Sequence, residues 1–314
     1  MKRIKRAVKL TISAWLKRHP TLVDRMLEEG MRIRYEMPVP PTHYYSPLPD
    51  LPAAKHRLSR WYREGNAEGL DWNLDKQIAF VQGLEVYKSE CDDLPSFSEV
   101  TAQGYGLGYG EVEAGFLHCM ARYFKPRRII EVGSGVSTYF TLQAVDTNAR
   151  ETNSRATVVC IEPFPSPRLH QLARDGSLTL CALEAQDVDI DLFKELGAGD
   201  ILFIDSTHVS KVDSDVNWLY LDVLPQLKSG VVIHIHDIPF PYLTFMPEHS
   251  LFDLSILWNE AALVKAFLMY NRAFDVLMCQ SYLHYKCPAV MKKVVSAYDD
   301  RKHFPASLWL MKRT

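Results

Sequence analysis

Two short apolar runs of the sequence each end in side chains that can bind a metal ion or move a proton. The first run is followed by Asp205 and His208, and the second by His236 and Asp237. Carboxylate oxygens with one imidazole suit a divalent cation such as Mg²⁺, and the candidate ligands are Asp205, His236 and Asp237. Alternatively, His208 removes a proton from a bound ligand beside Asp205, because an unperturbed imidazole titrates near neutral pH.

Other polar residues close to these two runs are expected to be structural. His234 alternates with His236 along its run, so we expect a hydrogen-bonded core histidine that faces a covering helix. Asp213, Asp215 and Asp222 lie between the two runs, where a helix is predicted, and we expect them to form its solvated face.

A third apolar run leads into an acid and a glycine turn. Within residues 129–138, Glu131 comes just before Gly133 and Gly135. Such a turn lets the backbone approach a ligand closely, and the helix that follows points its N–H groups at that ligand. An acid here would repel a pyrophosphate and better suits a cationic or amine-bearing ligand. The predicted ligand-binding residues of this turn are Glu131, Gly133, Ser134, Gly135, Ser137 and Thr138.

Polar residues also follow two further apolar runs. Glu162 closes the run 158–161, and an acid one strand beyond a glycine turn typically accepts hydrogen bonds from the hydroxyls of a ribose. After the next run, Gln186 or Asp187 is placed to bind the edge of an adenine.

The pattern of apolar runs predicts an α/β fold. Short, nearly continuous apolar strands that alternate with helices indicate a Rossmann-like, mostly parallel seven-stranded sheet with helices on both faces. Ligands of such sheets bind beyond the carboxyl ends of the strands. The predicted strands are 128–132, 157–161, 178–183, 200–204, 231–235, 274–280 and 307–312, and the main predicted helices between them are 136–147, 166–174, 213–227 and 258–270.

We expect an N-terminal helical and extended extension before this sheet. Residues 1–35 read as a basic amphipathic helical segment, 36–110 as a proline-rich segment and helical cap, and 111–314 as the ligand-binding domain. Residues 1–19 suit either peripheral contact with an anionic membrane or packing as a surface helix. The glycine-rich stretch 104–110 is either a flexible loop or a mobile cover over the ligand site.

Composition limits the classes of protein and the cellular locations that we expect. Its 314 residues are 47% apolar and 24% charged, with a net charge of −2, which gives no general argument for nucleic-acid binding. The six cysteines are scattered singly, so free thiols and a cytoplasmic location are expected, with the inner face of a membrane as an alternative. No run of about 18 apolar residues is present to span a membrane.

These features together resemble the class I S-adenosylmethionine-dependent methyltransferases. The turn at 131–138 is similar to their first motif, with Ser137 where a third glycine often stands, and Glu162 matches their ribose-binding acid. The resemblance covers about residue 105 to the C-terminus, and 307–312 resembles the antiparallel strand that this fold adds. It implies S-adenosylmethionine as the cofactor and a small-molecule acceptor.

A narrower resemblance is to the metal-dependent sugar O-methyltransferases. It implies that Asp205 is a metal ligand and that His208 is the base that activates a hydroxyl. That family has an acidic pair after the fifth strand, whereas this chain has His236 and Asp237. A hard ion such as Mg²⁺ prefers oxygen ligands to an imidazole, so the substitution weakens the implied metal site.

Two other classes share part of this pattern. A nicotinamide-dependent oxidoreductase has the same strand, turn and ribose acid, but it normally has a third glycine where this chain has Thr138. A non-catalytic cofactor-binding scaffold is the second alternative, and the presence of both Asp205 and His208 argues against it. The sequence leaves the acceptor and the oligomeric state open.

Overall fold

The computed structural model describes residues 15–16, 18–35, 43–106 and 108–313. Most of the basic segment 1–19 therefore lies outside the described residues, and its membrane contact stays a prediction. Among the described helices none is both long and apolar enough to cross a bilayer.

The chain divides into two compact units. The smaller comprises residues up to Trp61 together with Phe252–Leu257, and the larger comprises Tyr62–Leu251 and Trp258–Thr314. In the smaller unit, Asp50 caps a short helix by accepting a hydrogen bond from the backbone N–H of Ala53 at 3.0 Å. The described helices of this unit are α2 (Pro20–Tyr35), α3 (Leu51–His56) and α4 (Leu58–Trp61).

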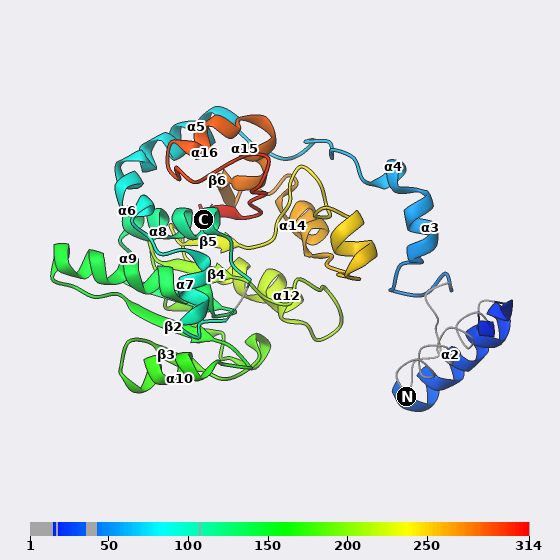
Figure 1. Ribbon diagram of the computed structural model, residues 1–314. Coiled ribbons are helices and arrows are strands. Elements are labelled where there is room, and N and C mark those ends of the chain that lie inside the picture. The colour runs from blue at the N-terminus through cyan, green and yellow to red at the C-terminus, as the bar shows by residue number, and fades with distance from the viewer. Residues whose placement is uncertain (1–14, 17, 36–42, 107, 314) are drawn as a thin grey trace. The chain divides into compact units, whose positions relative to one another are not determined.

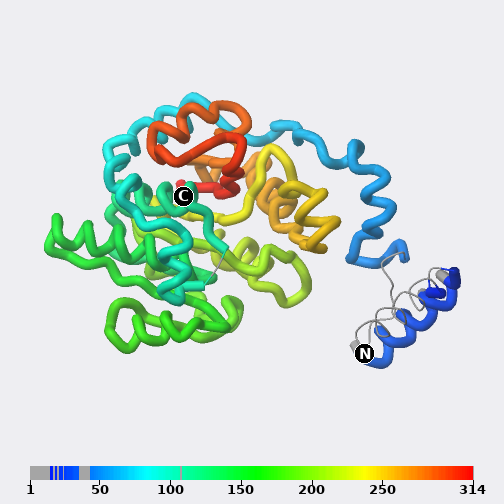
Figure 2. The backbone as a smooth tube through the Cα atoms, in the orientation of Figure 1, coloured from blue at the N-terminus to red at the C-terminus, as the bar shows by residue number. Residues whose placement is uncertain are grey.

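The larger unit is built on a seven-stranded sheet in the order β3-β2-β1-β4-β5-β7-β6. The strands from β3 to β5 are parallel, while β7 runs antiparallel to both of its neighbours. This C-terminal strand, red in Figure 2, enters the sheet between β5 and β6. The predicted fold class is confirmed. The strands are β1 (Arg128–Val132), β2 (Thr157–Ile161), β3 (Thr179–Cys181), β4 (Ile201–Ile204), β5 (Val232–Ile235), β6 (Phe274–Cys279) and β7 (Leu308–Lys312).

Helices pack on this sheet and surround its edges (Figure 1). The helices that precede β1 are α5 (Leu74–Gly83), the 3₁₀ turn η1 (Leu84–Tyr87), α6 (Lys88–Asp92), α7 (Phe97–Ala102) and α8 (Glu111–Phe124). Those between β1 and β5 are α9 (Val136–Thr152), α10 (Pro167–Arg174), the 3₁₀ turn η2 (Ala185–Asp187), α11 (Asp191–Lys194), α12 (Asp215–Trp218), the π-helical turn η3 (Leu219–Val223) and α13 (Leu224–Gln226). The rest are the π-helical turn η4 (Glu248–Asp253), α14 (Glu260–Leu268), α15 (Gln280–Lys286) and α16 (Pro288–Lys292).

Successive residues of each central strand enter two different hydrophobic cores. Ile129 and Phe203 belong to the core that includes side chains of α8 and α9. Ile130 and Leu202 belong to the core that includes side chains of α12, η3 and α14. Side chains alternate across a strand, so burial on both faces explains why these strands are apolar throughout.

The helix predicted at 213–227 is irregular in the structure. It begins at Asp215 because Ser214 is its N-cap, accepting from the backbone N–H of Asn217 at 3.2 Å. It then widens into the π-helical turn η3 before Pro225. A proline lacks the N–H that would bond to the residue four positions earlier, and its ring crowds that carbonyl group, which accounts for the wider turn.

Phe203 tests whether the end of β4 depends on this packing. Its side chain is fully buried and stacks on His234 with ring centroids 4.3 Å apart. We expect Phe203→Ala to lower the free energy of unfolding by about 3–5 kcal/mol in urea denaturation, because a cavity replaces the ring. Phe164→Ala is the control, since that ring is 87% exposed and its removal should change stability by less than about 0.5 kcal/mol. Equal losses in the two variants would contradict this packing.

Candidate active site

The turn after β1 lies against the end of β4. Gly133 has φ 80°, and a Cβ there would overlap the carbonyl oxygen of Asp205. The same two segments are joined by a hydrogen bond from the Asp205 N–H to the carbonyl group of Val132 at 2.8 Å. Glycine is therefore required at position 133 both by its backbone conformation and by the close approach.

Glu131 is buried beneath this turn rather than exposed at its rim. Its carboxylate accepts hydrogen bonds from the hydroxyls of Ser137 at 2.6 Å and Thr138 at 2.7 Å. Burial raises the pKa of Glu131 to about 7, against an ordinary value of 4.5. The sequence argument assumed a fully charged acid, whereas a group with this pKa is only partly ionised at neutral pH.

A cavity of about 350 Å³ opens beyond the ends of β1, β2 and β4, with Gly133, Glu162 and Asp205 among its lining residues. Glu162 accepts hydrogen bonds from the backbone N–H groups of Phe164 at 2.9 Å and Ser134 at 3.2 Å. These bonds fix the Glu162 carboxylate at the cavity wall, where its other lone pairs suit the hydroxyls of a ribose.

Of the two residues predicted to meet an adenine, only Gln186 lines the cavity. Its amide nitrogen donates to Glu184 at 2.6 Å, while its buried amide oxygen has no hydrogen-bond partner among the described residues. Asp187 is exposed and is not part of the lining. The unpaired amide oxygen of Gln186 is an acceptor that a ligand in the cavity would satisfy.

Asp213 is exposed, as predicted, but it precedes the helix, and Asp215 is only partly exposed, so the predicted solvated helix face is wrong for these two residues. Both residues line the cavity, and Asp215 accepts from the backbone N–H of Thr207 at 2.9 Å and from its hydroxyl at 2.6 Å. Asp222 is exposed, as expected. Because the helix begins only at Asp215, the preceding residues belong to the loop that bounds the cavity.

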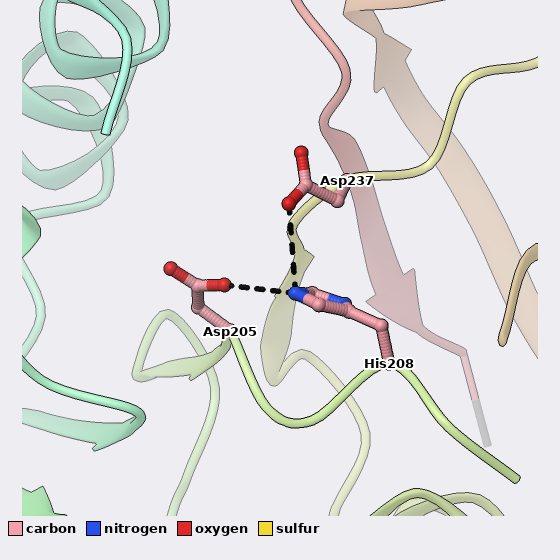
Figure 3. Close-up of side chains that lie close together, drawn as sticks. All are labelled: Asp205, His208 and Asp237. Carbon is pink, nitrogen blue, oxygen red and sulfur yellow. Dashed lines mark ion pairs between the residues drawn. The ribbon is translucent and has the colours of Figure 1, made fainter. Parts of the chain in front are cut away.

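A second cluster lies at the ends of β4 and β5 and consists of Asp205, His208 and Asp237 (Figure 3). The Nε2 atom of His208 is 3.2 Å from Oδ1 of Asp205 and 3.5 Å from Oδ2 of Asp237. One potential ligand atom from each of the three residues lies within 4.8 Å of the others. His208 and Asp237 have φ 58° and 55°, a conformation that costs energy for residues other than glycine and is concentrated at functional sites.

The opposite edge of the His208 ring is held by Glu260. Nδ1 of His208 lies 2.7 Å from a carboxylate oxygen of Glu260, which is itself only 2% exposed. Burial alone would lower the pKa of His208, but hydrogen bonds with Asp205 and Glu260 outweigh burial and raise this pKa to about 10. The imidazole is therefore protonated at neutral pH while these carboxylates face it.

His234 lies in β5, and His236 follows the end of that strand, next to Asp237. Nε2 of His236 is 3.8 Å from Oδ1 of Asp237, and its ring stacks on Tyr109 with centroids 4.7 Å apart. The expectation that His234 is buried is confirmed, but the expectation that it is hydrogen-bonded is wrong. Among the described residues neither of its ring nitrogens has a partner, and the ring packs between Phe203 and Trp309. Burial holds the pKa of His234 well below its ordinary value, so this ring is neutral.

The described part of the glycine-rich stretch packs over the site. Tyr105 and Tyr109 are both buried, and the carbonyl oxygen of Tyr105 lies 3.1 Å from where a Cβ of Gly135 would be. Within the described chain the hydroxyl of Tyr109 has no hydrogen-bond partner. Tyr105 thus packs against the glycine turn, while the choice between a flexible loop and a mobile cover stays a prediction.

Sequence reasoning missed Glu260. It is 52 positions from His208 along the chain. The available signal was an acid at the start of the helix predicted at 258–270, and an acid at that place equally suits the helix dipole. The acid could not be paired with His208 without the path of the chain between them.

Comparison with known proteins agrees with this geometry. Residues 130–238 match the family model described as a methyltransferase domain. This match confirms the predicted resemblance to the class I S-adenosylmethionine-dependent methyltransferases, and it identifies residues 130–238 as similar to a methyltransferase domain. An uncharacterized protein of Archaeoglobus fulgidus is 29% identical over 168 residues, which cover 50% of this chain and 73% of the relative.

Solved structures with similarity include three O-methyltransferases. A putative O-methyltransferase from Klebsiella pneumoniae has a TM-score of 0.40 at 14% identity, over 76% of this chain and 90% of that chain. TomG from Streptomyces achromogenes, solved with SAM, has a TM-score of 0.43 at 13% identity, over 84% of this chain and 96% of that chain. An O-methyltransferase from Bacillus cereus, solved with SAH, has a TM-score of 0.39 at 13% identity, over 75% of this chain and 91% of that chain. These similarities are weak, so the assignment depends on the family model, the sheet order and the turn.

Gly133 tests the close approach at the centre of the site. We expect Gly133→Ala to abolish binding of S-adenosylhomocysteine in titration calorimetry, because the added Cβ forces the turn away from Asp205. Gly176→Ala is the control, since Gly176 also has a positive φ but no atom lies within 4 Å of its added Cβ. That variant should be destabilised yet still bind the ligand. Undiminished binding by Gly133→Ala would contradict this account of the turn.

The raised pKa of Glu131 predicts that the free energy of unfolding depends on pH. The unfolded chain ionises this group near pH 4.5, whereas the folded chain does so near pH 7, so the folded state binds more protons between these values. Stability attributable to Glu131 is therefore greatest at low pH and falls as the pH rises to about 7. The expected fall, relative to Glu131→Gln, is about 3 kcal/mol in urea denaturation between pH 4.5 and 7.5. A difference between the two proteins that does not change with pH would rule out this description of Glu131.

Proposed function

We propose that this protein transfers the methyl group of S-adenosylmethionine to a hydroxyl of a small molecule, with sugars among the candidate acceptors. The observation that carries the proposal is the contact between the glycine turn and Asp205. It joins the cavity lined by Glu162 and Gln186 directly to a cluster that can accept a proton.

The cavity supports an assignment of the cofactor's parts. In the proposal, Glu162 holds the ribose hydroxyls and Gln186 meets the adenine edge. The methionine part crosses the turn from Gly133 to Gly135, near the backbone N–H groups at the start of α9. Glu131 acts through an intervening water, since the hydroxyls of Ser137 and Thr138 already occupy its carboxylate.

His208 is the proposed base. The acceptor oxygen attacks the methyl carbon, the carbon–sulfur bond breaks to leave S-adenosylhomocysteine, and the hydroxyl proton passes to Nε2 of His208. An unassisted hydroxyl is a weak nucleophile at neutral pH, so proton removal in the transition state accelerates the reaction. His208 has to be neutral at that moment, although Asp205 and Glu260 favour its protonated form in the structure.

A divalent cation fits the donor set of this cluster. Asp205 and Asp237 offer carboxylate oxygens, which Mg²⁺ prefers, and the nearby imidazole is a donor that first-row transition metals also accept. The sequence named His236 as the third ligand. The imidazole nearest to both acids is that of His208, but its Nε2 atom cannot bind the cation and accept the hydroxyl proton at the same time, so in the proposal the two carboxylates hold the cation. A bound cation would lower the pKa of the acceptor hydroxyl and offset the charge of both carboxylates.

The experiment that tests this function is transfer of a labelled methyl group from S-adenosylmethionine to a panel of hydroxylated acceptors. We expect His208→Ala to lower kcat on the order of 10²- to 10⁴-fold, because it removes a general base. Its affinity for S-adenosylhomocysteine should be unchanged. His170→Ala, at an exposed position on α10, is the matched control and should keep full activity. Full activity in His208→Ala would remove His208 as the base.

Metal dependence is tested separately. If a cation assists, chelation with EDTA should abolish activity, Mg²⁺ should restore it, and Asp237→Asn should raise the Mg²⁺ concentration needed. Activity that survives chelation, together with an unaffected Asp237→Asn variant, would exclude the cation while leaving His208 as the base.

A further inference from the structure

Residues 258–260, at the start of α14, contact both the ring and the backbone of His208. Nδ1 of His208 pairs with Glu260 at 2.7 Å, while the backbone N–H groups of Asn259 and Glu260 donate to the carbonyl oxygen of His208 at 3.1 Å and 3.2 Å. The ring of Trp258 lies 4.5 Å from the imidazole, tilted by 52°. Side chain and backbone of His208 are therefore both held by one short segment, 258–260.

Glu260 has a defined second partner. Its other carboxylate oxygen accepts from the hydroxyl of Tyr220 at 2.8 Å, and the Tyr220 side chain is fully buried. With Oε1 bonded to this hydroxyl, Oε2 is the atom that accepts a hydrogen bond from the Nδ1–H group of His208. A neutral His208 ring then carries its hydrogen on Nδ1, and its lone pair is on Nε2.

This arrangement determines which edge of the ring is presented to the reacting groups. Nε2 is the atom that lies beside Asp205 and Asp237, at the rim of the sheet. The opposite tautomer would place a hydrogen on Nε2 and leave no lone pair there for a proton or a cation. His208 also has φ 58°, a strained conformation that the two backbone hydrogen bonds from 259 and 260 help to hold.

We propose that Glu260 is a positioning residue, which fixes the tautomer and orientation of His208 so that Nε2 faces the acceptor. The proposal rests on the proposed function, in which Nε2 of His208 receives a proton. A carboxylate behind a histidine is a general way of fixing the ring, and loss of such a partner typically costs 10- to 100-fold in activity or metal affinity.

The test removes the Glu260 carboxylate without leaving the buried hydroxyl of Tyr220 unpaired. In the double variant Glu260→Leu/Tyr220→Phe both members of the pair become apolar, which is far milder than removing one partner. Tyr220→Phe alone is the matched control, because it keeps the carboxylate on His208. Glu260→Gln is a second variant of nearly the same volume, for use if the double variant does not fold.

Two readouts are measured on these proteins. The first is kcat and KM in the methyl-transfer assay, with affinity for S-adenosylhomocysteine measured alongside. The second is the ¹⁵N spectrum of the labelled histidines without cofactor or metal, in which a hydrogen-bonded, slowly exchanging Nδ1 proton identifies the pairing of His208. Assignment uses the signal that disappears in His208→Ala.

We expect the Nδ1 signal in the wild type and in Tyr220→Phe and its loss in the double variant. We also expect the double variant to lose kcat roughly 10- to 100-fold with KM for S-adenosylmethionine unchanged. An unchanged Nδ1 signal or an undiminished kcat in the folded double variant would overturn the proposal. If even the wild type methylates no acceptor, the proposed function fails, while the Nδ1 signal still decides whether Glu260 positions His208.

Discussion

The candidate site depends on the close approach of the Gly133 backbone to the carbonyl group of Asp205. β1 and β4 are parallel neighbours in the sheet, although β2, β3 and several helices lie between them in the sequence. The carboxyl ends of these two strands therefore lie side by side. The turn that follows β1 bounds the cavity, and the residue that follows β4 begins the acid and histidine cluster. Any side chain at position 133 would separate the two halves of the site.

The surroundings of Glu131 and His208 change the ionisation of both side chains. The pKa values of Glu131 and His208 are both raised above their ordinary values, to about 7 and about 10. For Glu131 the cause is loss of water around a carboxylate. For His208 the cause is the set of acids around the ring, whose effect exceeds that of burial. Formal charge alone makes Glu131 fully ionised at neutral pH, whereas the buried carboxylate is only partly ionised.

Local sequence patterns were enough to locate the strands and the residues at their ends. The bounds of β1 and β2 agree with those predicted, because each is a short apolar run enclosed by polar residues. The lining of the cavity by Glu162 and Gln186 follows from the same pattern, since parallel strands end at one edge. The roles of these residues toward a cofactor remain proposals.

Contacts between distant segments could not be predicted in this way. Glu260 reaches His208 from another helix, and Asp213 faces the cavity because the predicted helix starts two residues later than expected. The buried ring of His234 packs against the rings of Phe203 and Trp309 and makes no hydrogen bond with the described residues. The alternation of residues along a strand predicts that a side chain is buried, but it does not tell which kind of contact the side chain makes.

The most direct test of the account compares two ligands for the same turn. The measurement is titration calorimetry of the full chain with S-adenosylhomocysteine and, separately, with NADH. It shows whether the turn, with the buried Glu131 and the close approach at Gly133, binds an adenosyl-sulfur compound in preference to a dinucleotide. The account predicts saturable one-site binding of S-adenosylhomocysteine and no binding of NADH. Binding of NADH without binding of S-adenosylhomocysteine would contradict it.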